Sequence, residues 1–362
     1  MLDPTREGVG EAEWKAATAS CHALRVRRIV DETADARSIV LEIPPELRDT
    51  FRYRAGQFLS FKIPYRGAVL TRSYSLSSSP DCEPEHKFTV KRVDGGRVSA
   101  WMNERVAVGD VLQVTPPAGR FVLDGSERPL VLFSGGSGIT PCISLMKTAL
   151  ATTGRRVRLV YANRDERSII FREELEALAS RYPDPLSIVH SLDGRDGFVD
   201  VERVKRLVAD RLDAHFYLCG PGAFMATVEA ALEELGLHKD RLHLEIFSSP
   251  PDPGTEASGE RSAEVPAPAG VPEAITVVLD GEVHQVPYQE GESVLHAARR
   301  AGLDPPFSCE EGYCSCCMAK LSEGEVRMTA NDCLTPELLK EGWVLTCQSR
   351  CVSPKIRIEY PD

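Results

Sequence analysis

The chain has 362 residues, of which 42% are hydrophobic and 27% are charged, and its formal net charge is −11. This length predicts two or three domains, and the acidic charge excludes the basic surface that nucleic-acid-binding proteins carry. With no eighteen-residue apolar stretch, no signal-like start and an odd number of cysteines, eleven, we expect a cytoplasmic protein that neither enters a membrane nor depends on disulfides.

Residues 1–20 are predicted to form an N-terminal arm, and residues 21–125 a β-barrel domain. In the second range, short segments rich in β-branched residues recur between turn signals, for example at 37–43, 58–63 and 88–93. Closely spaced short strands of this kind are typical of an antiparallel barrel.

Two segments of the predicted barrel carry groups that can hold a ligand. The segment 72–75, Arg-Ser-Tyr-Ser, places a guanidinium that pairs well with phosphate beside an aromatic face. The glycine pair at 95–96 leads to Ser99 and a predicted helix over 100–104, whose N-terminal N–H groups form a second anion site. Alternating serine and tyrosine is also ordinary on a half-exposed strand, so the first segment alone does not identify a ligand site.

Residues 126–247 are predicted to form an α/β domain. Segments with helical periodicity, such as 171–181 and 223–235, alternate with short apolar runs. The runs lie at 130–133, 157–161, 186–189, 216–218 and 242–246. This alternation predicts a parallel sheet with helices on both faces.

A glycine-rich segment, 134–141, follows the first of these predicted strands and opens a helix, so its backbone N–H groups can meet a pyrophosphate. We expect Thr140 to cap the helix and Pro141 to be its first residue. Pro141 stands where the dinucleotide fingerprint has its third glycine, and a plain strand-to-helix turn would look similar. The segment 219–221, Cys-Gly-Pro, ends another strand at the same edge and should face the same crevice, unless Cys219 is simply a buried, inert thiol.

A proline-rich linker is predicted at 248–272, followed by a last domain at 273–362. In that domain Asp280-Gly281 predicts a hairpin, and Ser293 is expected to cap a short helix. Four cysteines follow the Cys-x4-Cys-x2-Cys…Cys spacing of a plant-type 2Fe-2S cluster: Cys309, Cys314, Cys317 and Cys347. A zinc site is disfavoured because only one Cys-x2-Cys arm is present. The sequence does not decide whether Cys316 and Cys351 are spare thiols or substitute ligands of the cluster.

Taken in order, these segments resemble the ferredoxin-NADP reductase superfamily over roughly 21–247 and the plant-type ferredoxins over about 273–362. The motifs that carry the first resemblance are Tyr53–Phe58, Arg72–Ser75, Pro117–Phe121, Gly135–Pro141, Cys219–Pro221 and Glu245–Phe247. The domain order is similar to that of the reductase components of multicomponent oxygenases, among them the ketosteroid hydroxylase and phenylacetyl-CoA epoxidase reductases. The resemblance implies an antiparallel β-barrel FAD domain, an α/β parallel-sheet nicotinamide domain and an α+β ferredoxin-like β-grasp domain.

The resemblance also implies a role for each matching position. Ser75, Cys219 and Glu245 would lie at the reacting centre, with Phe247 closing the flavin pocket. FAD would be held by Arg72, Ser73, Tyr74, Ser75, Val90, Lys91, Gly96, Arg97, Val98 and Ser99. The nicotinamide nucleotide would be held by Gly136, Gly138, Thr140, Asn163, Arg164, Cys219, Gly220 and Pro221, and the cluster by the four cysteines named above.

Nicotinamide delivers electrons in pairs and a 2Fe-2S centre takes them singly, so a flavin between them explains why one chain joins the three modules. We therefore expect a reductase that passes electrons from NADH or NADPH to a separate terminal oxygenase, Rieske-type or another monooxygenase. A non-oxygenase acceptor, such as a hybrid-cluster protein or a demethylase, and a redox-sensing role are the alternatives. The segment 161–167 offers both arginines for a 2′-phosphate and carboxylates for a 2′-hydroxyl, and so leaves the choice of nucleotide open.

Overall fold

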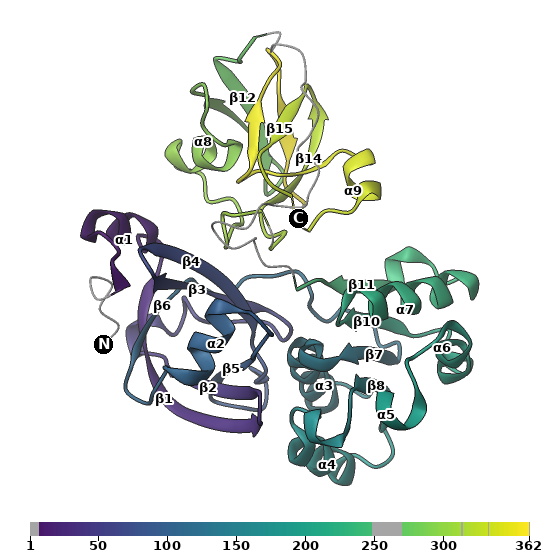
Figure 1. Ribbon diagram of the computed structural model, residues 1–362. Coiled ribbons are helices and arrows are strands. Elements are labelled where there is room, and N and C mark those ends of the chain that lie inside the picture. The colour runs from purple at the N-terminus through teal and green to yellow at the C-terminus, as the bar shows by residue number, and fades with distance from the viewer. Residues whose placement is uncertain (1–6, 248–269, 313, 332, 362) are drawn as a thin grey trace. The chain divides into compact units, whose positions relative to one another are not determined.

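The structure is a computed structural model that describes residues 7–247, 270–312, 314–331 and 333–361. It contains two compact units, Met1–Phe247 and Ser248–Asp362 (Figure 1). Most of the predicted linker, 248–269, and the first six residues of the predicted arm lie outside the described residues, while Glu11–Ala17 forms helix α1. Within the described part of the chain, none of the helices has the length and apolar character that a bilayer span requires.

The first unit begins with a six-stranded antiparallel sheet in the order β4-β3-β6-β1-β2-β5. Its strands are β1 His22–Thr33, β2 Ala36–Glu42, β3 Phe58–Tyr65, β4 Ala68–Ser75, β5 His86–Lys91 and β6 Val111–Val114. A bridge between Leu76 and Phe88 joins the two edge strands, so the sheet closes into a barrel. Helix α2, Arg97–Glu104, contributes Trp101 and Met102 to the barrel core.

The second sheet of this unit is entirely parallel, in the order β11-β10-β7-β8-β9. Its strands are β7 Leu130–Gly135, β8 Val157–Asn163, β9 Leu186–Leu192, β10 His215–Cys219 and β11 Leu242–Glu245. The connecting helices are α3 Ile139–Thr152, α4 Arg172–Arg181, α5 Asp193–Asp196, α6 Val201–Val208 and α7 Gly222–Glu234.

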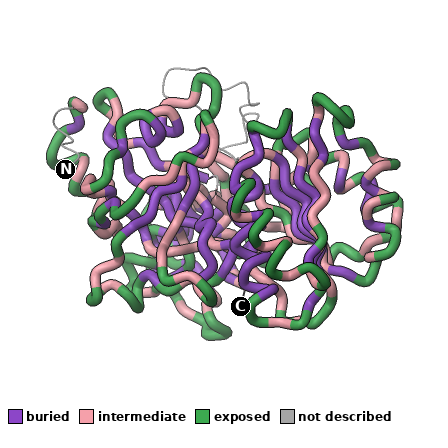
Figure 2. The backbone as a smooth tube through the Cα atoms, turned by 90° about the horizontal axis from the view of Figure 1, so that it is seen from below, coloured by how far each residue is buried: buried purple, intermediate pink, exposed green. Residues whose placement is uncertain are grey.

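Helices cover both faces of the parallel sheet because alternate residues of its central strand point in opposite directions. Leu130 and Leu132 of β7 belong to a core cluster that includes residues of α3 and α4. Val131 and Phe133 belong to the opposite cluster, with residues of α6 and α7. Figure 2 marks such buried segments in purple.

The order of the parallel sheet creates a switch point between β7 and β10. From β7 the chain proceeds to β8 and β9 on one side and returns to β10 and β11 on the other. Loops that leave neighbouring strands in opposite directions open a crevice at the carboxyl edge, where doubly wound sheets bind ligands. The loops that begin at Gly136 and Gly220 lie at this point.

The second unit has a five-stranded mixed sheet, β13-β12-β18-β14-β16, and a two-stranded sheet, β15-β17. The elements are β12 Ala274–Leu279, β13 Glu282–Pro287, α8 Val294–Arg300, β14 Met318–Glu323, β15 Val326–Met328, α9 Pro336–Lys340, β16 Trp343–Leu345, β17 Ser349–Cys351 and β18 Arg357–Glu359. Asp280 and Gly281 both have positive φ angles, 51° and 75°, as a two-residue hairpin turn requires. Ser293 accepts a hydrogen bond from His296 N, which confirms the predicted cap.

The antiparallel barrel, the parallel sheet with its helices and the mixed α+β unit confirm the predicted fold classes.

Candidate functional site

Strand β4 carries the first group of candidate cofactor-binding residues. Its register with β3 pairs Phe61 with Arg72 and Phe58 with Ser75. The Tyr74 ring stacks on Phe88 with centroids 6.0 Å apart and planes at 28°, and burial raises the pKa of its hydroxyl. The ring is therefore a fixed, neutral aromatic group next to a buried serine, a surface that fits a flat heterocycle.

Gly96 forms the second candidate group, the N-terminus of α2. The helix begins at Arg97 with Gly96 as its cap, so the prediction that it starts at Ala100 was wrong. Ser99 lies in the first turn and accepts a hydrogen bond from Val93 N at 3.1 Å. A Cβ built on Gly96 would lie 2.5 Å from Ser99 Oγ and 3.0 Å from Val93 O. Glycine thus keeps the turn tight and leaves the amides of the helix start accessible to an anion, which fits a flavin pyrophosphate.

Three further predicted flavin residues have different environments. Val98 and Val90 are buried among the apolar residues of the barrel core. The Lys91 ammonium lies 3.9 Å from Asp35 Oδ2, and 3.7 Å from the position that a Cβ on Gly136 would take. A positive charge of the barrel therefore stands beside the glycine loop of the parallel sheet.

The glycine loop after β7 differs from the prediction at its helix start. A 3-10 turn, Gly136–Gly138, precedes α3, and Gly138 is the cap residue. Thr140 is therefore not the N-cap, and Pro141 is the third helical residue, because the helix begins at Ile139. The Thr140 hydroxyl instead donates a hydrogen bond to Ser137 O at 3.1 Å and closes the turn.

The two loops at the switch point touch through their backbones. A Cβ on Gly138 would lie 2.1 Å from Cys219 O, and a Cβ on Gly220 would lie 2.9 Å from Gly135 N and 3.0 Å from Gly135 Cα. Only glycine permits this approach. The backbone N–H groups of both loops are thereby gathered at one edge, which is the arrangement that a dinucleotide pyrophosphate needs.

Cys219 and Glu245 lie side by side in the register of β10 and β11. Cys219 is fully buried, and burial raises the pKa of its thiol. Burial also raises the pKa of the Glu245 carboxyl to about 8, although part of the residue is exposed. Both groups are therefore neutral near pH 7. Phe247, two residues beyond, is 45% exposed, so a large part of its ring is open to a bound group.

The end of β8 carries the groups that were expected near the adenosine. Neither polar atom of the buried Asn163 amide has a hydrogen-bond partner among the described residues, and such groups are usually satisfied by a ligand or water. Arg164 pairs with Asp35 of the barrel, Nη2 to Oδ2 3.3 Å. Asp165 caps the following turn by accepting a hydrogen bond from Ser168 N at 2.9 Å.

In the second unit the four predicted ligand cysteines lie in two pairs. Cys309 N donates to Cys314 Sγ at 3.4 Å, and a hydrogen bond with Cys347 lowers the pKa of the Cys317 thiol. The charge of Cys309 is also among the causes that raise the pKa of Cys347. A cluster of two irons takes two cysteines on each iron, so this pairing fits it.

A backbone N–H group and a side-chain amide around these thiols donate hydrogen bonds to sulfur. Glu311 N donates to Cys309 Sγ at 3.4 Å, and Gln348 Nε2 donates to Cys347 Sγ at 3.5 Å. Glu310 and Ser315 have positive φ angles of 60° and 52°, a conformation that costs a non-glycine residue about 1–3 kcal/mol. The loop is thus held in a special shape, as expected of a segment that wraps a cluster.

Cys316 and Cys351 have different environments. Cys316 is buried next to Cys314, inside the cysteine loop. Cys351 belongs to the apolar core of the unit, where its N–H donates to Tyr288 Oη at 3.0 Å and burial raises the pKa of its thiol to about 11. Of the two, Cys316 is therefore the one that lies with the ligand thiols.

The sequence interpretation missed two residues near the site, Asp35 and Lys147. Asp35 lies in the turn between β1 and β2 and contacts Arg164 across 129 positions of sequence. Lys147 is buried and is the one charged residue of helix α3. A lone lysine within an apolar helical segment is the one signal in the sequence that could have pointed to it.

Comparisons with known proteins agree with this geometry. Three family models match the chain: an oxidoreductase FAD-binding domain at residues 23–123, an oxidoreductase NAD-binding domain at 132–230 and a 2Fe-2S iron-sulfur cluster binding domain at 277–352. The ferredoxin reductase component of 3-ketosteroid-9-alpha-monooxygenase from Rhodococcus rhodochrous is 43% identical, over 93% of this chain and 96% of that protein. A component of the 1,2-phenylacetyl-CoA epoxidase of Escherichia coli is 33% identical, over 94% and 97%. The fold matches phthalate dioxygenase reductase, with a TM-score of 0.59 and 24% identity, over 99% of this chain and all of that one.

Proposed function

The chain belongs to the reductase components of oxygenases that join FAD-binding, NAD-binding and 2Fe-2S domains, and from this premise we propose that it takes electrons from NADH and delivers them to a separate hydroxylating oxygenase. A bound flavin would supply the conversion between the hydride of the nicotinamide and the single electrons that an iron–sulfur cluster takes up. The observation that supports the proposal most is that the four spaced cysteines form two contacting pairs, Cys309 with Cys314 and Cys317 with Cys347, in the same chain as a nucleotide crevice.

In this proposal the residues of the first unit bind and orient the two organic cofactors. Arg72 and the α2 amides behind Gly96 hold the phosphates of FAD, and Tyr74 packs against its ring. The loops at Gly138 and Gly220 bind the pyrophosphate of the nicotinamide nucleotide. No protein group has to act as a general base, since the neutral Cys219 thiol and Glu245 carboxyl position the ring without abstracting a proton.

The preference for NADH over NADPH rests on the residues that follow β8. A 2′-phosphate needs an arginine that is free to pair with it. Arg164 already pairs with Asp35, and Lys91 lies near the same carboxylate. Because Arg164 is held by a carboxylate, this arrangement favours an unphosphorylated 2′-hydroxyl.

For the acceptor, we propose a Rieske-type or other monooxygenase related to the partners of the two curated relatives. The 43% identity over nearly the whole chain favours the 3-ketosteroid-9-alpha-monooxygenase system over the epoxidase. We also propose a cytoplasmic location, because a cluster held by cysteine thiolates calls for a reducing compartment.

An anaerobic titration of the purified protein tests the function. NADH should bleach the flavin absorbance and then produce the paramagnetic signal of a reduced 2Fe-2S centre, with NADPH less effective at equal concentration. Addition of a 3-ketosteroid oxygenase component, its steroid and oxygen should then give hydroxylated product. A protein that reduces ferricyanide but supports no oxygenase would favour a non-oxygenase acceptor, and a protein without iron would contradict the proposal.

A further inference from the structure

Helix α3 carries three buried polar side chains on one face. Lys147 and Thr148 follow Ser144 by three and four residues, so all three lie together on the helix surface. They are 0%, 5% and 8% exposed. A buried ammonium is costly unless it is paired and hydrogen-bonded, so the position of Lys147 requires partners from elsewhere in the fold.

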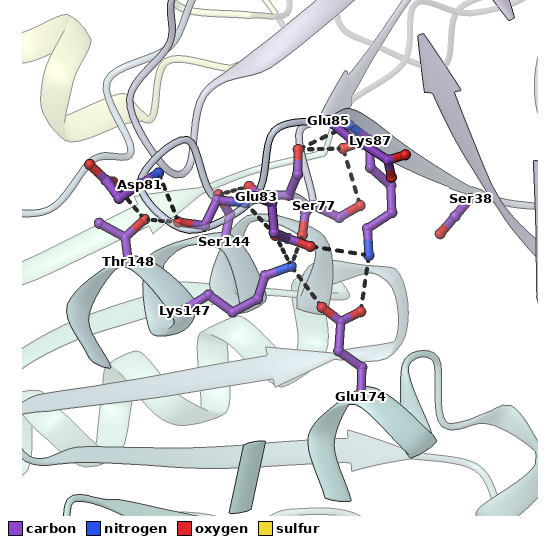
Figure 3. A network of polar contacts seen from close by, with 12 residues as sticks. Ser38, Ser77, Asp81, Glu83, Glu85, Lys87, Ser144, Lys147, Thr148 and Glu174 are labelled. Carbon is purple, nitrogen blue, oxygen red and sulfur yellow. Dashed lines mark hydrogen bonds and ion pairs between the residues drawn. The ribbon is translucent and has the colours of Figure 1, made fainter. Parts of the chain in front are cut away.

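These partners are three successive residues of the barrel, in the segment that follows β4. Ser144 Oγ donates to Ser78 O at 2.6 Å, and Lys147 Nζ donates to Ser77 O at 2.8 Å. The hydroxyls of Thr148 and Ser79 lie 2.6 Å apart. Figure 3 shows this face of α3 directed at the barrel segment.

Lys147 also belongs to a partly buried ion-pair network that crosses the same boundary. Its ammonium lies 2.5 Å from Glu83 Oε2 of the barrel and 2.7 Å from Glu174 Oε1 of α4 (Figure 3). Lys87 of β5 contacts the other oxygen of Glu174 at 3.0 Å. Burial opposes the ionisation of Glu174, but the charges of Lys147 and Lys87 outweigh it and lower the pKa of Glu174. Two cations and two anions thus balance within one partly buried group, in which Lys147 is the most buried member.

Helix α3 and strand β4, which these bonds connect, each end at one of the two candidate cofactor sites. Helix α3 starts directly after the Gly136–Gly138 turn, and Lys147 lies eight residues, or about 12 Å, along the helix from Ile139. Ser77 lies two residues beyond Ser75, the end of β4. Because a helix and a strand of a closed sheet are both stiff, the bonds at residues 77–79 set the separation of the glycine loop from the flavin strand.

We propose that Lys147 is a positioning residue for electron transfer: by bonding Ser77 O and Glu83 of the barrel, it holds α3 and the glycine loop in register with the strand that ends at Ser75. This inference rests on the proposed function, which places the nicotinamide nucleotide on the loop and the flavin on the strand. Lys147 touches neither cofactor site. It acts through the orientation of the helix, and a misplacement of about 1 Å at a reacting centre can cost roughly 100-fold in rate.

Substitution of Lys147 tests the proposal, with a matched control in the same domain. Lys147→Met removes the ammonium. Lys147→Met combined with Glu174→Gln also removes one carboxylate, so that one cation, Lys87, and one anion, Glu83, remain in the network and the loss of charge balance cannot by itself unfold the protein. Lys147→Arg keeps the charge. Lys205 is the control because it too pairs with two glutamates, Glu202 and Glu234, but contacts no barrel residue through these pairs.

Three quantities are measured on each FAD-loaded variant. They are the NAD⁺ dissociation constant, the amide hydrogen exchange of residues 77–79 and 139–150 without nucleotide, and the anaerobic rate of flavin reduction at saturating NADH. In both Lys147→Met variants the rate of flavin reduction should fall by about 10-fold or more, and the amide hydrogens of residues 77–79 should exchange faster. The FAD content and the nucleotide affinity should stay within about 2-fold of wild type. Lys147→Arg should recover most of the rate, and Lys205→Met should match wild type.

Unchanged flavin reduction in both Lys147→Met variants would overturn the role of Lys147, and so would faster exchange without a slower rate, because that pattern belongs to a purely structural residue. Equal slowing by Lys205→Met would overturn it as well. A wild-type protein that neither nucleotide reduces would instead overturn the proposed function itself, so the two failures are distinguishable.

Discussion

Replacing Gly138 by alanine should damage the nucleotide crevice through a backbone collision. The backbone of Gly138 is helical, with φ −60° and ψ −9°, so alanine brings no conformational strain. Its Cβ, however, would lie 2.1 Å from Cys219 O and 2.4 Å from Cys219 C. These atoms belong to the main chain of β10 and cannot rotate away, so the two loops must separate by roughly 1 Å. Forced overpacking of this kind costs about 1–3 kcal/mol.

The loss should appear both in nucleotide binding and in stability. A cost of about 1–3 kcal/mol corresponds to a weakening of NAD⁺ binding by roughly 5- to 150-fold. Calorimetric titration measures the affinity, and thermal unfolding should show a decrease of several degrees. Gly222→Ala is the control, because a Cβ at Gly222 meets nothing within 4 Å and that glycine begins α7, directly after the second loop. Equal NAD⁺ affinities in the two variants would refute the argument that nucleotide binding requires the close approach of the two loops.

Three further predictions concern the cluster, the choice of nucleotide and pH. Cys314→Ser should abolish delivery to the oxygenase and the paramagnetic signal but keep NADH–ferricyanide activity within about 2-fold, and loss of both activities would contradict the order of carriers. Asp35→Asn should release Arg164 and improve kcat/KM for NADPH relative to NADH by up to about 5-fold, the range of an exposed ion pair; an unchanged ratio would disprove their role in selectivity. The pKa of the Glu245 carboxyl is raised to about 8 in the folded protein, against a usual value of 4.5. The unfolded chain therefore loses this proton first, and the free energy of unfolding falls as pH rises from about 4.5 to about 8. A pH series of unfolding temperatures should show this loss in wild type and not in Glu245→Gln.

The order and type of most elements could be predicted because their signals are local. Alternation with a period of two or 3.6 identifies the strands and helices of both sheets, and Asp280-Gly281 and Ser293 carry turn and capping chemistry in their own side chains. The cysteine spacing is equally local, since three of the four thiols come from one loop. The helix starts at Arg97 and Ile139 were misplaced because a glycine cap leaves no side-chain signal.

The contacts between the barrel and the parallel sheet could not be predicted. Lys147 meets Ser77 across 70 positions, and Arg164 meets Asp35 across 129. Arg164 does not differ in its local pattern from an arginine that faces solvent, and the isolation of Lys147 in an apolar segment does not indicate which residues it contacts. Their partners are determined by how two complete domains dock, which depends on the packing of surfaces assembled from distant segments.

The separation of the two crevice loops along the chain has a consequence for biosynthesis. All six barrel strands lie between His22 and Val114, whereas the crevice needs both Gly138 and Cys219. At a translation rate of about 5–20 residues per second, the ribosome takes roughly 5–20 s to advance from Val114 to Cys219. The nascent barrel therefore has time to fold, and to recruit its flavin, before any nucleotide can dock.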